Sequence, residues 1–185
     1  RLETGTTTLR KTRRDVEVNL SAIAKGYGVD VVFEQLRAAG FADVFVEIGG
    51  EVRVSGHNPR GEPWRVGINV PRSSADPTAV LVAVPLNDRA IATSGDYRNF
   101  FEAGGRRYSH IIDPQTAAPV EHDLVSVSVL AADCATADGL ATALSVLGEE
   151  RGRVLLASFP GTEALFVRGV GNELEVTRTA GFPHP

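Results

Sequence analysis

Two oxygen-bearing side chains, Asp138 and Thr142, are spaced so that they could bind one metal ion. They lie four residues apart in a segment whose apolar residues recur at helical spacing, so a helix would place both on one face. Both are hard oxygen donors, and Mg²⁺ needs few protein oxygens because water and substrate phosphate fill its other positions. The pair therefore predicts a Mg²⁺ site. Taken alone, a structural role is the commoner alternative, with Asp138 complementing the helix dipole and Thr142 packing.

A second group of residues is suited to binding phosphate. Ala22 to Gly26 occupies the first turns of a predicted helix, where free backbone amides and the positive end of the helix dipole attract anions. Lys25 adds a full positive charge. The alternative is an ordinary helix start with a solvated lysine, because the segment lacks the glycine pattern of the Walker and Rossmann motifs.

His110 is the residue whose chemistry suits proton transfer. Strand alternation would put it on the same face as Tyr108 and Ile112, next to a turn that begins at Asp113. An imidazole with an ordinary pKa of about 6.5 can take a proton from a hydroxyl near neutral pH. A hydrogen-bonded histidine within a sheet is the alternative. The other histidines lie in loop-like segments without metal-ligand spacing: His57, His122 and His184.

Two glycine-containing segments adjoin predicted strands. In Thr93-Ser94-Gly95-Asp96-Tyr97-Arg98, a permissive glycine joins hydroxyls, an acid and a base. This segment predicts either a ligand loop that includes Ser94 and Gly95 or a surface turn with Asp96 and Arg98 paired. Gly49-Gly50-Glu51 is interpreted as a tight hairpin rather than a site.

Helices before and after a run of strands must position these residues. Apolar spacing predicts a helix over residues 21–40, with Ser21 as its N-terminal cap and Gly40 as the left-handed residue that ends it. A second helix is predicted over 133–147 and is closed by Gly148, and a third over 149–158. Strands are predicted where β-branched or alternating segments lie between turn residues: 44–48, 51–56, 64–70, 79–86, 90–93, 107–112, 124–131, 163–168 and 173–177. This order favours an α+β fold with a mainly antiparallel sheet and packed helices.

Composition narrows the class of protein further. The chain has 185 residues, with 19 Lys plus Arg against 23 Asp plus Glu, a net charge of −4 that is dispersed along the sequence. We expect no nucleic-acid partner from such a distribution. A single cysteine excludes an internal disulfide and a thiolate zinc cage, and no apolar run approaches the roughly 20 residues that span a bilayer. The sequence contains no Met, so we expect a processed or truncated part of a longer product.

The motifs in their order along the chain resemble the ApbE-type FAD:protein FMN transferases. They are Asn19-Leu20-Ser21-Ala22-Ile23-Ala24-Lys25-Gly26-Tyr27, Gly49-Gly50-Glu51, Thr93 to Arg98, Ser109-His110-Ile111-Ile112-Asp113-Pro114, and Ala137-Asp138 with Thr142. The resemblance implies an ApbE-like domain over residues 1–185. It implies a Mg²⁺-dependent enzyme that cleaves FAD and attaches FMN to a threonine or serine hydroxyl of a target flavoprotein.

The resemblance also implies a role for individual residues. Mg²⁺ would take the backbone carbonyl of Ala22, the carboxylate of Asp138 and the hydroxyl of Thr142, and His110 would be the base that activates the acceptor hydroxyl. The residues implied in FAD binding are Asn19, Lys25, Ser94, Gly95 and Ile112. Phosphoryl transfer depends on neutralised phosphate charge and a positioned nucleophile, in agreement with this set.

Two departures from the family pattern keep alternatives open. Asn19 stands where family members usually have Asp, so one charge is lost although the amide still hydrogen-bonds. Family proteins also extend well before this motif, so we expect a domain truncated on its N-terminal side. The alternatives are a FAD pyrophosphatase that releases FMN and AMP, and a noncatalytic flavin-binding module. Family members act outside the cytoplasm, which implies an exported protein in the periplasm or at the cell surface, including lipid-anchored forms.

Overall fold

The computed structural model describes residues 17–95, 100–103, 106–109, 111–120 and 122–184, together with residues 11 and 13–15. Its helices are α1 (Ser21–Ala38) and α2 (Cys134–Leu156). The strands are β1 (Val44–Ile48), β2 (Glu51–Ser55), β3 (Trp64–Asn69), β4 (Val80–Leu86), β5 (Ala90–Gly95), β6 (Phe100–Ala103), β7 (Arg106–Ser109), β8 (Ile112–Asp113), β9 (Ala118–Pro119), β10 (Leu124–Ala131), β11 (Glu163–Val170) and β12 (Glu173–Arg178).

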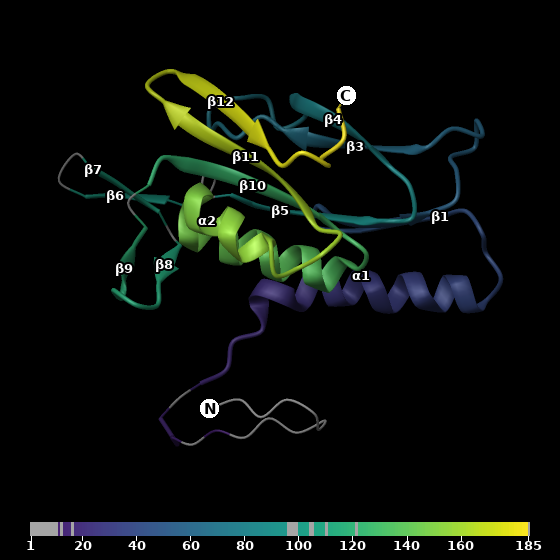
Figure 1. Cartoon of the computed structure of the whole chain (residues 1–185), viewed down its shortest axis with the longest axis horizontal. Helices are drawn as coiled ribbons and strands as arrows, with labels where there is room; N and C mark the ends of the chain where they lie inside the picture. The colour runs from purple at the N-terminus through teal and green to yellow at the C-terminus, as the bar shows by residue number, and fades with distance from the viewer. Residues whose placement is uncertain are drawn as a thin grey trace.

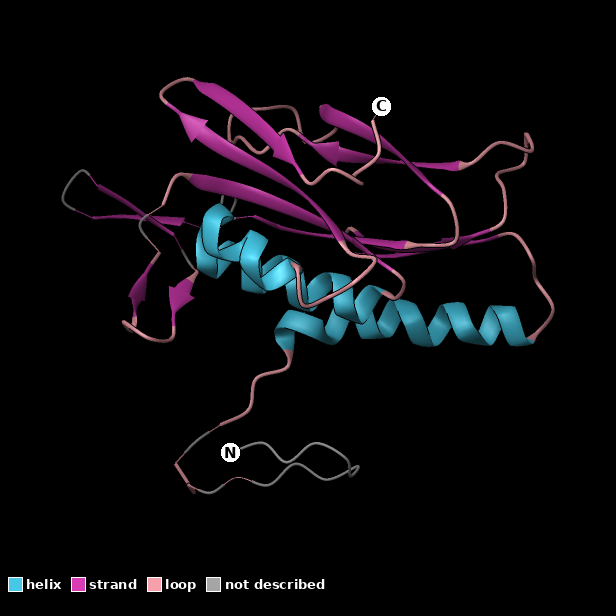
Figure 2. Cartoon of the chain, viewed as in Figure 1, coloured by secondary structure: helices cyan, strands magenta, loops and turns pink. Residues whose placement is uncertain are grey.

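A six-stranded antiparallel sheet forms the centre of the fold. Its strand order is β1-β2-β5-β10-β11-β12, and every neighbouring pair is antiparallel. Three further antiparallel pairs, β3-β4, β6-β7 and β8-β9, are separate from it. Figures 1 and 2 show α1 and α2 together along one face of this sheet and the β3-β4 pair beyond its other face. The predicted α+β class with a mainly antiparallel sheet is confirmed.

Both faces of the central strands are buried because layers cover them on each side. In β11, Phe166 packs in the core shared with α2, whereas Leu165 and Val167 pack in the core shared with β3 and β4. The same alternation runs through β10, where Val129 faces the α2 side and Leu130 the opposite side. A smaller cluster joins α1 to β1. Neither described helix has the length and apolarity needed to cross a membrane.

The two ends of α1 show one wrong and one confirmed prediction. Ser21 does not cap the helix through its side chain; instead, the Ser21 backbone N–H donates to Oδ1 of Asn19 over 2.8 Å. The amide of Asn19 is thus the acceptor that satisfies a free N–H at this helix start. At the other end Gly40 has a φ of +92°, the left-handed conformation expected of the residue that ends a helix.

The remaining differences concern two segments. Gly148, with φ 76° and ψ 172°, interrupts α2 as predicted, and the helical continuation ends at Leu156, two residues before the predicted end. The predicted single strand over 107–112 is wrong, because β7 ends at Ser109 and β8 begins at Ile112. The strands of the β6-β7 pair have 4 residues each and those of the β8-β9 pair have 2, so they are too short to show the alternation of a strand in the sequence.

Candidate active site

A cavity of about 400 Å³ brings together most of the residues that the sequence singled out. Its wall includes all three predicted metal ligands, Ala22, Asp138 and Thr142. The predicted cofactor-binding residues in the same wall are Lys25, Ser94, Gly95 and Ile112. Asn19 is not in the wall and instead holds the start of α1. His110, Asp96 and Arg98 lie outside the described residues, although Ile111, which follows His110, lines the cavity.

Close contact between the two helices fixes the position of Asp138. The Gly26 backbone N–H on α1 donates to Oδ2 of Asp138 on α2 over 3.0 Å, and this hydrogen bond is buried. A Cβ on Gly26 would lie 2.4 Å from the carbonyl oxygen of Cys134. Only glycine therefore allows the helices to approach this closely. Oδ1 of Asp138 accepts no hydrogen bond from any residue that the structure describes, so this oxygen is left for a ligand.

Asp30 holds the start of α2 against α1. Its Oδ1 accepts the Cys134 N–H over 2.9 Å, and its Oδ2 accepts the Ala135 N–H over 2.8 Å. Arg53 on β2 donates to the same Oδ1 over 2.8 Å. Two of the free amides at the N-terminus of α2 are satisfied in this way, and the charge of Asp30 complements the helix dipole. Asp30 therefore helps to fix where the start of α2 lies against α1, and with it the position of Asp138 on α2.

We expect Asp30→Ala to lower the free energy of unfolding by about 3 kcal/mol, because it leaves the Cys134 and Ala135 N–H groups without an acceptor and removes one of the two carboxylates that pair with Arg53. Glu34→Ala is the matched control, since Glu34 is 59% exposed and pairs with the same arginine over 2.9 Å. An exposed pair contributes about 0–1 kcal/mol. Urea unfolding measures both variants, and equal losses would contradict the role given to Asp30.

Lys25 and Glu51 form an ion pair in the wall of the cavity. The Lys25 ammonium donates to Oε1 of Glu51 over 2.7 Å; the Lys25 side chain is 49% exposed and that of Glu51 is 2% exposed. Burial raises the pKa of Glu51, Lys25 opposes the shift, and the charge of Asp138 adds to it. Burial also raises the pKa of Asp138, while the Gly26 N–H and Lys25 oppose that shift. Two carboxylates thus face one ammonium, so the cavity favours a cation.

The end of β5 supplies another part of the cavity wall. Pairing with β10 continues to Gly95, which lies opposite Ser126, and the Thr93 and Ser128 hydroxyls are hydrogen-bonded at 2.7 Å. The strand therefore holds Ser94 and Gly95 at the cavity through regular sheet pairing rather than through an isolated loop.

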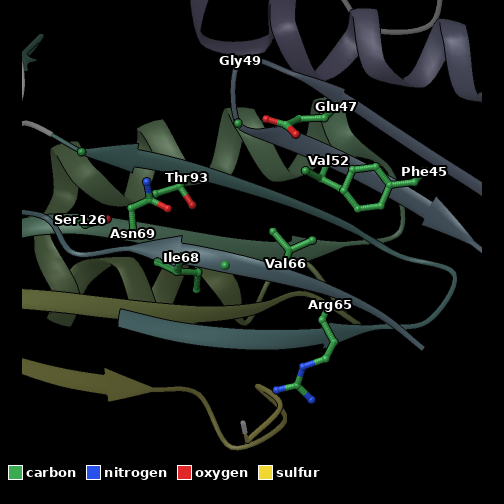
Figure 3. A pocket seen from close by; sticks show the side chains of 13 residues that line it. Phe45, Glu47, Gly49, Val52, Arg65, Val66, Ile68, Asn69, Thr93 and Ser126 are labelled. Carbon is green, nitrogen blue, oxygen red and sulfur yellow. The ribbon is translucent and has the colours of Figure 1, made fainter. Parts of the chain in front are cut away.

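A larger cavity of about 640 Å³ lies between β3 and the strands β1, β2 and β5 (Figure 3). Figure 3 shows Asn69 and Thr93 near one another on one side of it, with Phe45 and Glu47 on the β1 side. Five consecutive residues of β3, from Arg65 to Asn69, line it. Thr93 and Gly95 line both cavities, so the two meet at the end of β5.

Sequence reasoning missed two residues of this site. Glu51 was interpreted only as part of a hairpin, which is correct, since Gly49 and Gly50 have φ values of +61° and +97°. The signal that could have identified it is a glutamate at the first position of a strand whose other residues are mostly buried. Asp30 had no comparable signal, because the two amides that it accepts, those of Cys134 and Ala135, lie more than 100 residues along the chain.

Comparison with known proteins finds a family match over most of the chain. Residues 1–166 match the model of the ApbE family. The chain is 54% identical over 145 residues to the FAD:protein FMN transferase of Vibrio cholerae, covering 78% of the chain and 43% of that protein. It is 41% identical over 145 residues to the FAD:protein FMN transferase of Escherichia coli K12, covering 78% of the chain and 41% of that protein. The chain thus spans less than half the length of these relatives.

A solved structure shows the same fold. The flavin transferase ApbE from Vibrio cholerae superposes with a TM-score of 0.83 at 42% identity, covering 98% of this chain and 56% of that one. The apo form of the flavinyl transferase ApbE of Pseudomonas stutzeri gives a TM-score of 0.73 at 43% identity, covering 86% of this chain and 48% of that one. Because the family model, the sequence relatives and the solved folds agree over most of its residues, the chain belongs to the ApbE family.

Proposed function

We propose that this chain carries the metal and catalytic residues of a Mg²⁺-dependent transferase that moves the FMN half of FAD to a serine or threonine hydroxyl of a target flavoprotein. The observation that carries the proposal is the meeting of Ala22, Asp138 and Thr142 with Lys25 in one cavity. Ala22 and Lys25 lie on α1, more than 100 positions before Asp138 and Thr142 on α2. The names of the relatives support FAD as the substrate and a protein as the acceptor.

The donor set fits a magnesium ion. A backbone carbonyl, a carboxylate and a hydroxyl are all hard oxygen donors, and Oδ1 of Asp138 is left for a ligand among the described residues. Burial raises the pKa of both Asp138 and Glu51, so a cation bound beside them would stabilise their charged forms. Bound Mg²⁺ would neutralise phosphate charge and polarise a phosphoryl oxygen.

Lys25 is placed to bind the phosphates of FAD. An ammonium has three N–H donors, and one goes to Glu51, which leaves two for phosphate oxygens. The side chain is half-exposed at the cavity, so a ligand can reach it. The first turn of α1 adds the positive end of a helix dipole next to Lys25. Both features favour an anionic ligand over a neutral one.

Transfer then requires a hydroxyl oxygen and a base. The acceptor oxygen attacks the phosphorus on the FMN side, a new P–O bond forms, and the bond to the bridging oxygen breaks so that AMP leaves with the electron pair. We assign the hydroxyl proton to His110, on the family resemblance and on the place of Ile111 and Ile112 in the cavity wall. If water replaces the hydroxyl, the same steps give free FMN, which is the pyrophosphatase alternative.

We expect His110→Asn to leave FAD affinity nearly unchanged and to lower the transfer rate by about 100- to 10,000-fold, the usual contribution of one positioned base. A neutral imidazole adds no charge that would hold a pyrophosphate, so binding does not depend on it. Single-turnover transfer to an acceptor protein and FAD fluorescence titration measure the two quantities separately. A large loss of affinity with an unchanged rate at saturation would rule out this role.

A further inference from the structure

Glu51 carries a charge in a place where strand packing alone would favour an apolar residue. It opens β2 directly after the hairpin turn, pairs with Ile48 in the β1-β2 register, and is 2% exposed. Withdrawing a carboxylate from water is costly unless partners compensate for it. A buried ion pair can often be replaced by apolar residues of similar volume without loss of stability. Stability therefore does not explain a glutamate at this position.

The partners of its two oxygens differ. Oε1 accepts the Lys25 ammonium over 2.7 Å, whereas Oε2 is buried and accepts no hydrogen bond from any residue in the described part of the chain. A half-satisfied buried carboxylate costs free energy that a fully paired one would not. Glu51 thus makes one strong contact, and that contact goes to a residue of the cavity.

The two side chains of the pair are held unequally. Glu51 is enclosed, whereas half of the Lys25 side chain is open to solvent. A lysine has a long flexible stem, so a free ammonium would sample many positions. The Lys25 stem passes beside the hairpin turn, where a Cβ on Gly49 would lie 3.3 Å from Cδ of Lys25 and 3.7 Å from Oε2 of Glu51. The buried partner therefore fixes the exposed one.

We propose that Glu51 is a positioning residue for the nucleotide site, which acts by holding the Lys25 ammonium at the cavity so that its other two N–H donors meet the phosphates. This inference rests on the proposed function, because it takes FAD as the ligand whose phosphates Lys25 binds. Glu51 acts through Lys25 in this proposal, because its Oε1 accepts the Lys25 ammonium and its Oε2 is buried.

The test is a double-mutant cycle in the longest form of the protein that contains these 185 residues, with FAD and excess MgCl₂ as the probe. Glu51→Gln keeps the shape of the side chain and removes its charge. We expect it to weaken FAD binding by about tenfold, because it loosens one charge-assisted contact. In a protein that already carries K25M, Glu51→Gln should weaken FAD binding no further, because there is no Lys25 ammonium left to position. The second substitution also removes a carboxylate that would otherwise repel phosphate.

Controls separate positioning from folding. Glu173→Gln changes the exposed residue that opens β12 after the β11-β12 turn, so FAD affinity should not change. Glu51→Met fills the same volume without polar atoms and should weaken binding as Glu51→Gln does, with thermal unfolding confirming that both variants fold. Equal weakening by Glu51→Gln in both backgrounds, or no weakening in either, would overturn the inference. If K25M itself leaves FAD affinity unchanged, the proposed nucleotide site fails, and Glu51 has no ligand to position.

Discussion

Asp138→Ala is expected to lower Mg²⁺-dependent turnover of FAD by about 1,000-fold or more. The variant removes the one carboxylate of the predicted metal set, and a bound cation supplies several kcal/mol of charge stabilisation in the transition state. Asp138 is 7% exposed, so its role in the fold must be considered as well. Its loss leaves the Gly26 N–H without an acceptor, but it also removes a buried charge, so we expect the free energy of unfolding to change by less than about 2 kcal/mol.

The sign of the pH effect follows from the raised pKa of Asp138. A carboxyl whose pKa is raised in the folded state disfavours folding once it ionises. This penalty disappears as the pH falls below the pKa that the same carboxyl has in the unfolded chain. Asp138→Ala should therefore be least destabilising at neutral pH in the absence of Mg²⁺.

Asp133→Ala is the matched control for this variant. Asp133 caps the same helix by accepting the Thr136 N–H over 2.8 Å and is not in the cavity wall. Its loss should cost about 1 kcal/mol of stability and leave turnover unchanged. Turnover assays over a range of MgCl₂ and in EDTA decide between the two, and ordinary Mg²⁺-dependent activity of Asp138→Ala would disprove the metal assignment.

Gly26→Ala is expected to abolish activity and to destabilise the fold by about 3 kcal/mol. The new methyl group would lie 2.4 Å from the Cys134 carbonyl oxygen and 2.8 Å from Cβ of Asp138. The first of these atoms belongs to the backbone of α2 and cannot rotate away, so the helices must separate. That separation breaks the hydrogen bond that holds Asp138 and moves the carboxylate away from Ala22.

Gly28→Ala tests whether the effect of Gly26→Ala comes from any alanine in α1 or from the contact of residue 26 with α2. Gly28 lies two residues further along α1, and its Cβ would lie 3.3 Å from Cδ1 of Ile48, the end of a flexible side chain. Alanine favours a helix by about 1 kcal/mol over glycine, so this variant should be neutral or more stable. Chemical denaturation and FAD turnover on both variants provide the comparison; equal behaviour would mean that the helix contact at Gly26 does not position the site.

The parts of the fold that sequence could predict are those with a local cause. The helix over 21–40 and the β1-β2 hairpin were predicted because apolar spacing and two adjacent glycines act within a few residues. The cap at Ser21 was wrong because Ser21 is already the first helical residue, after Leu20 at the cap position, and Asn19 accepts the Ser21 N–H. The strand over 107–112 was wrong because the chain leaves it after Ser109, and no turn residue marks that point.

The sequence could predict which residues form the site, but not the contacts that position them. Asp138 and Thr142 were found from their spacing, and the ordered motifs joined them to Lys25. The contacts of Gly26 with Asp138 and of Asp30 with the α2 amides link segments more than 100 residues apart, so no local pattern reveals them. The role of Glu51 was not predicted for a related reason, since its partner Lys25 lies on another element, α1.

Transfer of FMN to a protein hydroxyl is measured most directly by mass spectrometry of an acceptor flavoprotein after incubation with the protein, FAD and MgCl₂. We predict a mass gain of one FMN less water, located by fragmentation on a serine or threonine, together with one AMP released per modified acceptor. The gain should disappear in EDTA and in Asp138→Ala. Free FMN with an unmodified acceptor, or modification that persists in EDTA, would contradict a Mg²⁺-dependent FMN transfer at this cavity.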